Sequence, residues 1–162
     1  MSLSFPSYRA NLTTGEVIPT MRQRVERLEK AMHDIPQVDC PVRHYFAPGL
    51  FAREITIPAG TALIGAIHKV ENLAILSKGK LEIVTDEGTQ TIEAPWTGTV
   101  KPGAKNCAVA LEDAVWTNFY RTDTTDLDAL CEELTFSKAS ELLGGKDNPQ
   151  LLKSGRLMEL EN

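Results

Sequence analysis

Cysteine and histidine, the residues that most often build metal and nucleophilic sites, are scarce in this 162-residue chain. It has three of each, and Cys40, Cys107 and Cys131 form no closely spaced pair. We therefore expect no structural zinc site built on cysteine. The spacing of the histidines also supports no Ser/His/Asp or Cys/His arrangement. We expect the cysteines to be small buried side chains of a protein in a reducing compartment.

Long apolar runs, basic clusters and phosphate-binding glycine loops are lacking too. The longest uncharged apolar stretch, residues 55–67, is too short to span a bilayer, and residues 1–16 have no signal-peptide pattern. The 17 basic and 22 acidic residues give a net charge of −5 without any Lys/Arg block, which argues against nucleic acid and anionic membranes as partners. Neither GxGxxG nor a P-loop motif occurs, so a nucleotide-phosphate loop is excluded. We expect a cytoplasmic protein that binds neither nucleic acid nor membrane.

The first of three segments, residues 1–41, carries one helical pattern. Thr20 is a suitable N-cap, and Pro36 ends the pattern. Between them an apolar residue recurs at every third or fourth position, namely at Met21, Val25, Leu28, Met32 and Ile35. This stripe predicts a helix that either packs on the core of its own domain or pairs with its copy in a homodimer.

The middle segment, residues 42–121, predicts an all-β sandwich or barrel. Short β-rich stretches alternate with turns at intervals of roughly ten residues. The expected strands cover residues 53–57, 61–68, 72–77, 80–84, 89–93, 106–111 and 115–120.

The third segment, residues 122–162, predicts a helical extension. Asp123, Thr124 and Thr125 are N-cap candidates for a helix over residues 127–134. A short helix at 137–143 and a frayed helical tail at 146–162 are expected to follow. We treat the three segments as one globular unit.

The turns of the middle segment resemble those of a known family. The turn at residues 58–60, the strand with His68, the break at Gly79 and the turn at Pro102-Gly103 resemble the two motifs of the cupins. This resemblance implies a small jelly-roll (RmlC-like) β-barrel. It also implies a divalent metal held by three histidines and a glutamate.

The cupin ligand positions are mostly replaced in this sequence. Counted from the motif glycine, the glutamate position falls on Asn72, next to Glu71, and the second histidine falls on His68. The first histidine position is Ala66, and the histidine of the second motif falls on or near Asn106. In a regular strand Glu71 points away from Asn72. We therefore expect no cofactor, with a weak divalent-metal site at His68 and Glu71 as the alternative.

Several pieces of the sequence are also similar to small cupin-like proteins encoded by bacteriophages. These pieces are residues 76–79, 84–88, 92–95, 101–105, 110–117, 121–123 and 126–127. In those proteins a histidine often precedes the Glu-Asp pair, where this chain has Leu111. The similarity spans residues 42–134 and implies the fold and a bacteriophage source more than an activity.

Alternation along the strands predicts which residues line the barrel interior. The expected lining is Ile64, Ala66, His68, Asn72, Ala74, Asn106, Ala108 and Ala110. Small alanines leave room for a small polar ligand held by His68, Asn72 and Asn106. The alternative is a filled barrel, in which these polar groups bond to one another or to buried water.

An acidic turn and a tryptophan complete the candidate site. Glu112 and Asp113 beside Trp116 are suited to a cationic or stacked ligand at the barrel mouth. The favoured interpretation is structural, with Asp113 bonding backbone amides in a turn and Trp116 filling the core. His33 and His44 are expected at the surface or at an interface.

Three functions stay open on these grounds. The first is a non-catalytic bacteriophage accessory protein of the host cytoplasm that binds a small polar ligand. Its ligand-binding residues would be His68, Asn72, Asn106, Glu112 and Trp116. The alternatives are a metal-dependent cupin enzyme of the oxygenase or isomerase type, and a structural module that binds a phage or host protein. The expected assembly is a homodimer.

Overall fold

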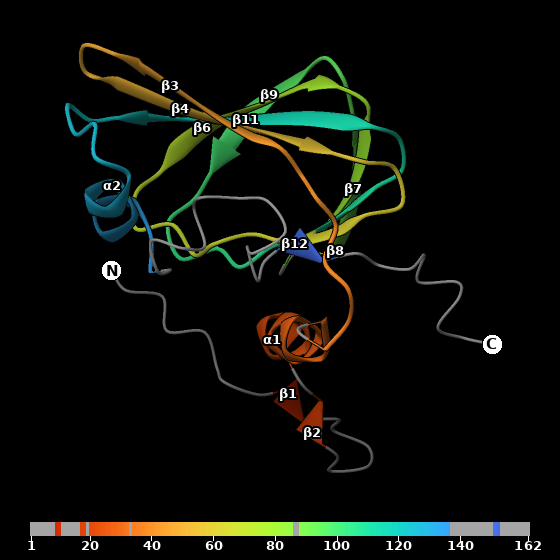
Figure 1. The fold of residues 1–162 in the computed structure, drawn as a ribbon. Helices are drawn as coiled ribbons and strands as arrows, with labels where there is room; N and C mark the ends of the chain where they lie inside the picture. Colours follow the sequence, from red (N-terminus) through yellow and green to blue (C-terminus); the bar gives the residue numbers. More distant parts are fainter. Residues whose placement is uncertain are drawn as a thin grey trace.

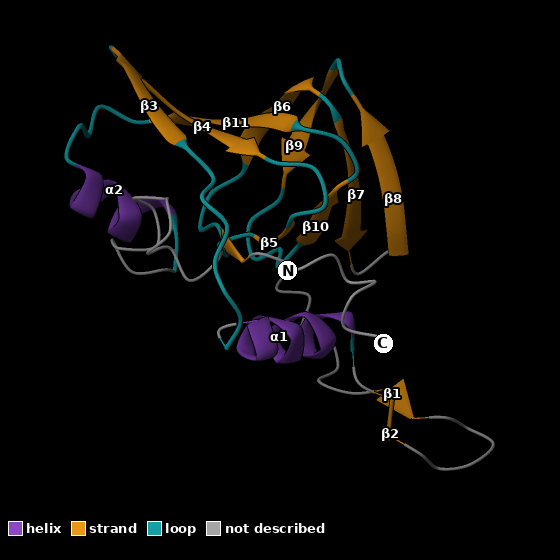
Figure 2. Cartoon of the chain, turned by 45° about the vertical axis from the view of Figure 1, so that its right-hand side comes forward, coloured by secondary structure: helices purple, strands orange, loops and turns teal. Residues whose placement is uncertain are grey.

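Two five-stranded antiparallel sheets face each other in the computed structural model (Figure 1 and Figure 2). Sheet 1 has the order β3 (Val42–Ala47), β4 (Leu50–Ile57), β11 (Ala114–Arg121), β6 (Asn72–Lys78) and β9 (Trp96–Val100). Sheet 2 has the order β12 (Leu151–Leu152), β5 (Ala62–Ile64), β10 (Cys107–Ala110), β7 (Lys80–Thr85) and β8 (Gly88–Glu93). A short pair, β1 (Arg9–Ala10) and β2 (Val17–Ile18), stands apart.

The structure describes residues 9–10, 17–18, 20–32, 34–85, 88–136 and 151–152. Within these residues, strands that are neighbours in a sheet are often not consecutive in the sequence. For example, β11 lies between β4 and β6. The structure confirms the predicted fold, a mainly β jelly-roll barrel. One helix precedes the barrel in the sequence and one follows it.

Glycine is required where β6 turns into β7. Gly79 has φ +82°, and a Cβ at this position would lie 2.2 Å from the backbone oxygen of Asp113. Other residues avoid this φ region, and the contact has no room for a methyl group. The carboxylate of Asp113 accepts a hydrogen bond from the Ala59 amide at 2.9 Å, which holds the neighbouring turn. The break expected at Gly79 and the turn role expected for Asp113 are both confirmed.

Helix α1 (Met21–Met32) covers the outer face of sheet 2 (Figure 2). Its first turn has a reciprocal cap, because Thr20 Oγ1 accepts from the Gln23 amide and Gln23 Oε1 accepts from the Thr20 amide. The apolar stripe packs into a buried cluster made of Val25, Met32, Ala62, Ile64 and Cys107. An ion pair of 2.7 Å between Lys105 Nζ and Glu29 Oε1 joins the helix to the loop before β10.

This packing confirms that the helix packs on the core of its own domain, the first of the two predicted alternatives. Val25 and Met32 are only 3% and 4% exposed, so the stripe is occupied within its own chain. This packing does not test the homodimer, since Met21, Leu28 and Ile35 are only partly buried. It stays a prediction.

Helix α2 (Leu127–Leu134) covers one end of the barrel, below the β3–β4 hairpin in Figure 1. Its N-cap is Asp126, one residue beyond the predicted candidates, whose Oδ1 accepts from the Ala129 amide. Leu130 and Leu134 pack with Phe51 and Tyr120 of sheet 1. The predicted helix over residues 127–134 is confirmed.

Some strand predictions are wrong. β3 and β9 lie where the sequence predicts no strand. The strand predicted over residues 61–68 ends at Ile64, because residues 67–69 exchange backbone hydrogen bonds with residues 134–136. Only His68 forms an isolated bridge, to Thr135. Ile64 also packs toward α1 and not into the barrel, since it belongs to the cluster on the outer face of sheet 2.

All three cysteines are buried and free, as expected. Burial raises the pKa of the Cys40 and Cys107 thiols to about 11, so neither is a reactive thiolate at neutral pH.

Several predicted features lie outside the described residues, namely His33, the helix at 137–143 and most of the tail from residue 146. Within that tail Leu151–Leu152 forms a strand beside β5 and not a helix. None of the helices in the described part of the chain is long and apolar enough to cross a membrane.

Candidate functional site

The inner face of sheet 1 is divided into an apolar row and a polar row of register partners. The apolar row runs across the sheet through Val42, Ile55, Trp116, Leu76 and Trp96. The polar row lies two residues away along every strand, through His44, Arg53, Asn118, Ala74 and Gly98. Because strand residues two apart share a face, both rows point into the barrel. The apolar row packs against Leu81, Ile92 and Ala110 of sheet 2, which completes the core.

The two tryptophans of the chain fill the apolar half. Trp96 and Trp116 stack with ring centroids 5.6 Å apart. The Trp96 ring lies over Gly98, where an added Cβ would be 2.5 Å from two ring carbons. Trp116 is partly buried and packs against the core, in agreement with the favoured, structural interpretation of this residue.

A chain of hydrogen bonds leads from the core tryptophan into the polar half. Trp116 Nε1 donates to Asn118 Oδ1 at 2.8 Å, and Asn118 Nδ2 donates to Asn72 Oδ1 at 2.8 Å. Asn72 is 4% exposed, and its Nδ2 is buried without a hydrogen-bond partner among the described residues. Most buried polar groups are satisfied, so this amide is an exception that asks for an explanation.

His68 joins the same cluster from the connection between β5 and β6. Its Nδ1 lies 3.1 Å from the hydroxyl of Tyr120, and the two rings are 5.8 Å apart. Burial and, second, the positive charge of Arg53 lower the pKa of His68 to about 4. Burial raises the pKa of Tyr120, although Arg53 acts in the opposite direction. At neutral pH both side chains are therefore uncharged.

Arg53 and His44 form the other side of the cluster. Burial lowers the pKa of Arg53 against the opposing effect of Tyr120, but a guanidinium remains protonated in a protein. Burial and the Arg53 charge also lower the pKa of His44. His44 stacks on Phe51 at 5.7 Å, and its Nδ1 is buried without a partner in the described part of the chain. His44 therefore points into the barrel, whereas the sequence predicts a surface or interface position.

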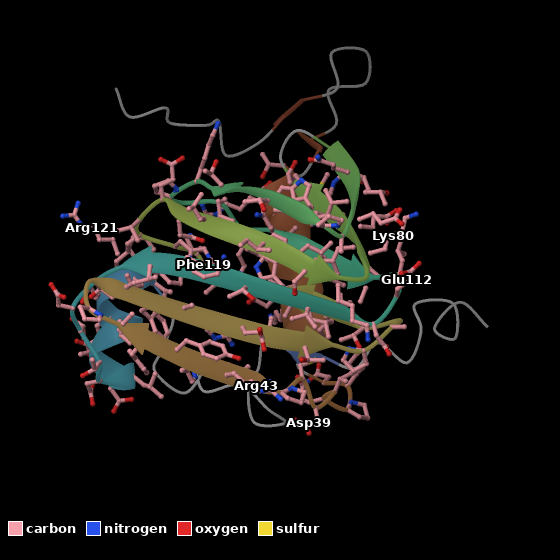
Figure 3. All side chains as sticks on the ribbon, turned by 90° about the horizontal axis from the view of Figure 1, so that it is seen from above. Asp39, Arg43, Lys80, Glu112, Phe119 and Arg121 are labelled. Atoms are coloured by element: carbon pink, nitrogen blue, oxygen red, sulfur yellow. The ribbon has the colours of Figure 1, made fainter. Side chains whose placement is uncertain are left out.

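The structure does not bring the other predicted ligand residues to this cluster. Asn106 lies before β10, where its backbone oxygen accepts from the Gly65 amide. Glu112 is exposed in the turn before β11, at the periphery of the molecule in Figure 3. Glu71 is exposed too, next to the buried Asn72. Of the predicted set, Asn72 and Trp116 are linked through Asn118, and His68 pairs with Tyr120, which lies four residues beyond Trp116 on β11.

The residues present do not fit the divalent metal that cupins imply. Within the described residues, no group of three or more His, Cys, Asp and Glu side chains is placed to hold a metal ion. Glu71 is exposed, His68 Nδ1 is bonded to Tyr120, and the guanidinium of Arg53 lowers the affinity of the same space for a cation. We derive no metal-dependent step.

Arg53, Asn118, Tyr120 and His44 were missed by the sequence prediction, although a signal for the first three existed. Arg53 is two residues before the inward Ile55, and Asn118 and Tyr120 are two and four residues beyond the inward Trp116. Continuing the alternation would have placed all three inside.

Two surface hollows lie outside the barrel. One, of about 250 Å³, is on the outer face of sheet 1 and is lined by Tyr45, Phe46, Ala47, Leu50, Ala52, Glu54, Thr117 and Phe119. Figure 3 looks onto this face, with Arg43 and Phe119 labelled. The other, of about 340 Å³, lies at the tip of the β3–β4 hairpin beside residues 122–125.

Comparison with known proteins gives similarity at the level of structure. No family model matches the sequence, and no curated protein matches it. The chain is similar to ectoine synthase from P. lautus, with 18% identity and a TM-score of 0.50 over 69% of this chain and 85% of that one. It is also similar to an RmlC-like cupin from Shewanella frigidimarina, with 16% identity and a TM-score of 0.44 over 51% of this chain and 76% of that one. KdgF from Halomonas sp. is 13% identical, with a TM-score of 0.46 over 53% of this chain and 82% of that one. Similarity at these identities concerns the fold.

Proposed function

We propose that this chain, whose fold is that of the cupins, is a non-catalytic protein that binds a small polar ligand in the polar half of its barrel. The observation that carries the proposal is the buried Nδ2 of Asn72, which has no hydrogen-bond partner among the described residues. Leaving such a group unsatisfied costs about 1–3 kcal/mol. A bound ligand that accepts this hydrogen bond would recover that free energy.

The surroundings of Asn72 support a ligand at this place. The polar groups of His44, Arg53 and His68 share the interior with it, and the three residues are partly buried. Ala74, the neighbour of Asn118 in the polar row, is small. A small polar ligand bound at Asn72 would lie beside these polar groups.

The same residues favour binding over catalysis. Among the described residues of the cluster, Arg53 is charged at neutral pH while His68 and Tyr120 are not, because the pKa of His68 is low and that of Tyr120 is high. A general base needs a pKa near the working pH, and neither group has one. A setting in a bacteriophage-infected cell, with a host metabolite or signalling molecule as the ligand, is proposed on the sequence resemblance alone.

A protein-interaction module is the second candidate. It is favoured by the outer face of sheet 1, where Tyr45, Leu50 and Leu73 are 46%, 43% and 53% exposed beside the hollow described above. Exposed apolar side chains that cluster on one face often mark a contact with another protein. A homodimer formed through this face is one form of such a contact.

Native mass spectrometry of the full chain, purified without chelator, tests the proposal. We expect a retained small molecule that is lost in Asn72→Leu and kept in Ser77→Ala, a control on the outer face of the same strand. A stoichiometric metal that disappears in His68→Ala would overturn the proposal in favour of an enzyme. An empty protein that also fails to respond to added ligands would overturn it in favour of the interaction module.

A further inference from the structure

We infer that the free edge of β3 pairs with β3 of a second copy of the chain, in the antiparallel register that places Arg43 opposite Tyr45 of the other copy. This inference goes beyond the ligand proposed for the barrel interior and does not depend on it. Three features of β3 support it: an open sheet edge, outward backbone groups along that edge, and side chains that complement one another in one register.

The edge of sheet 1 at β3 is open. At the other edge of the sheet, β9 follows β8 of sheet 2 after only two residues, so the chain itself connects the two sheets there. β3 is the outermost strand of sheet 1 on the side where Figure 3 labels Arg43. It contains neither lysine nor proline and pairs with β4 without a bulge. β3 therefore lacks three features that commonly keep another strand from joining an edge.

The backbone of β3 presents hydrogen-bonding groups along this edge. The carbonyl oxygen of Pro41 accepts from the Thr56 amide at 2.9 Å, so Pro41 faces β4. Because residues of an antiparallel strand alternate in the direction of their N–H and C=O groups, the odd-numbered residues of β3 face β4 and the even-numbered ones face outward. No backbone partner among the described residues takes up the outward groups, which belong to Val42, His44 and Phe46.

One register uses all of these outward groups. Outward residues must face outward residues for the new ladder to form. When His44 faces His44 of the second copy, Val42 faces Phe46, and the two-fold axis repeats that pair on the other side. A shift of two residues in one direction sets Arg43 opposite Arg43, which are like charges. A shift in the other direction sets Val42 opposite Pro48 in the turn and shortens the ladder.

The side chains complement one another in the register centred on His44. Arg43 is 74% exposed, since its ion pair with Glu54 is a long 3.9 Å, and it would lie against the ring of Tyr45 of the second copy. The hydroxyl of that ring bonds a carboxylate, because Tyr45 donates to Glu54 at 3.3 Å. Tyr45 and Phe46, 46% and 44% exposed in the single chain, would both be covered.

The other face of the new ladder is compatible with the same register. It pairs the aromatic ring of Phe46 with the β-branched Val42 of the second copy, a combination that stabilises antiparallel strands. The two His44 side chains meet between these pairs. Burial and, second, the charge of Arg53 lower the pKa of His44, so the central pair is uncharged at neutral pH.

Sedimentation velocity of the full chain over a range of concentrations tests the inference. We expect a dimer that Tyr45→Lys weakens about tenfold or more, because the two-fold axis sets each new lysine opposite an arginine. Leu73→Lys is the matched control and should leave the dimer unchanged. Leu73 is 53% exposed on the same outer face, but it lies on β6, away from the edge. Equal weakening by both variants would overturn the inference in favour of packing through the outer face. A wild-type chain that is monomeric at its highest soluble concentration would also overturn it.

Disulfide trapping tests the register and keeps the test decisive if Tyr45→Lys does not fold. Residues 43 and 45 of two copies would be a non-hydrogen-bonded pair, with Cα atoms about 4.5 Å apart, which suits a disulfide. Arg43→Cys and Tyr45→Cys chains, co-expressed with different tags and mildly oxidised, should cross-link about tenfold more than either variant alone. The mixed dimer keeps one native Arg43–Tyr45 pair. The wild type is the control, since its three cysteines are buried. Cross-linking that is no greater in the mixture would overturn the inference.

Discussion

Trp116 donates its indole hydrogen to Asn118, two residues further along the same face of β11, at 2.8 Å. This single bond connects the two halves of the barrel interior. On one side Trp116 stacks against Trp96, and on the other Asn118 holds Asn72. The bond therefore fixes which end of each amide faces the core and which faces the polar cluster.

Asn118→Leu removes the central link of this chain. We expect a loss of about 1–3 kcal/mol in the free energy of unfolding, because an indole N–H and the oxygen of Asn72 lose their partners inside the barrel. Urea denaturation followed by circular dichroism measures it. Asn106→Leu is the matched control and should change stability by less than about 0.5 kcal/mol, since Asn106 is only half-buried and lies outside the cluster. Equal effects of the two variants would contradict the role of the chain.

Gly79→Ala tests the tight passage between β6 and β7. The added methyl group would lie 2.2 Å from the oxygen of Asp113 in a backbone with φ +82°, so we expect a loss of about 3 kcal/mol or more. Gly103→Ala separates the steric clash from the strain of a positive φ. Gly103 has φ +76°, but no atom lies within 4 Å of its added Cβ. This control should cost about 1 kcal/mol. Thermal melts that show the same shift for both variants would exclude a steric cause.

Glu29→Gln tests the ion pair that joins α1 to the loop before β10. Lys105 is 8% exposed at its side chain and lies 2.7 Å from Glu29, so loss of the partner charge leaves a poorly solvated ammonium. We expect a loss of about 1–2 kcal/mol that persists at high salt. Glu26→Gln breaks the pair with Arg22, whose members are about half exposed, and should cost less than about 0.5 kcal/mol. A loss that vanishes in 1 M salt would show that the Glu29 pair is screened like a surface pair.

The stability of the protein should fall as the pH falls from 6.5 toward 4. The folded chain holds the pKa of His68 at about 4, below the ordinary 6.5, so between these values the unfolded chain binds more protons. The groups that face His68 are Arg53 from β4, which disfavours its protonation, and Tyr120 from β11, which bonds its Nδ1. The loss is at most about 3 kcal/mol. His44, whose pKa is lowered too, adds to it in the same direction.

Urea denaturation at several pH values between 7 and about 4 checks this expectation. The same series on His68→Gln isolates the histidine, because every other titrating group is shared by the two proteins. The difference in stability between wild type and variant should shrink as the pH decreases. Parallel curves would mean that His68 does not titrate as its buried position requires.

The sequence predicts the barrel better than the site. The helices at 21–32 and 127–134 and most strands follow from apolar periodicity, which depends only on neighbours along the chain. β3 was missed although Pro48-Gly49 marks a hairpin turn, because its residues are mostly exposed and mixed in polarity. β9 was missed between two proline-containing turns, with a glycine at its centre.

The site depends on contacts that local patterns do not contain. His68 lies on a loop, so no period can place it, and its partner Tyr120 is 52 residues away in sequence. Arg53 is different, since alternation through Phe51, Arg53 and Ile55 already turns it inward. The sequence analysis does not include Arg53 in the barrel lining, although its position on the strand places it there.

The absence of a side chain at Gly98 lets Trp96 lie flat against the edge of sheet 1 and reach Trp116 on the central strand. Parallel indoles at this separation couple their electronic transitions, and the coupling vanishes when the rings part. The coupled signal of the two indoles therefore reports whether the edge strand β9 has separated from its neighbour β6. Since edge strands open before central ones, the circular-dichroism signal of the coupled indoles should fade at the first loosening of the barrel, before the signal of the peptide backbone is lost.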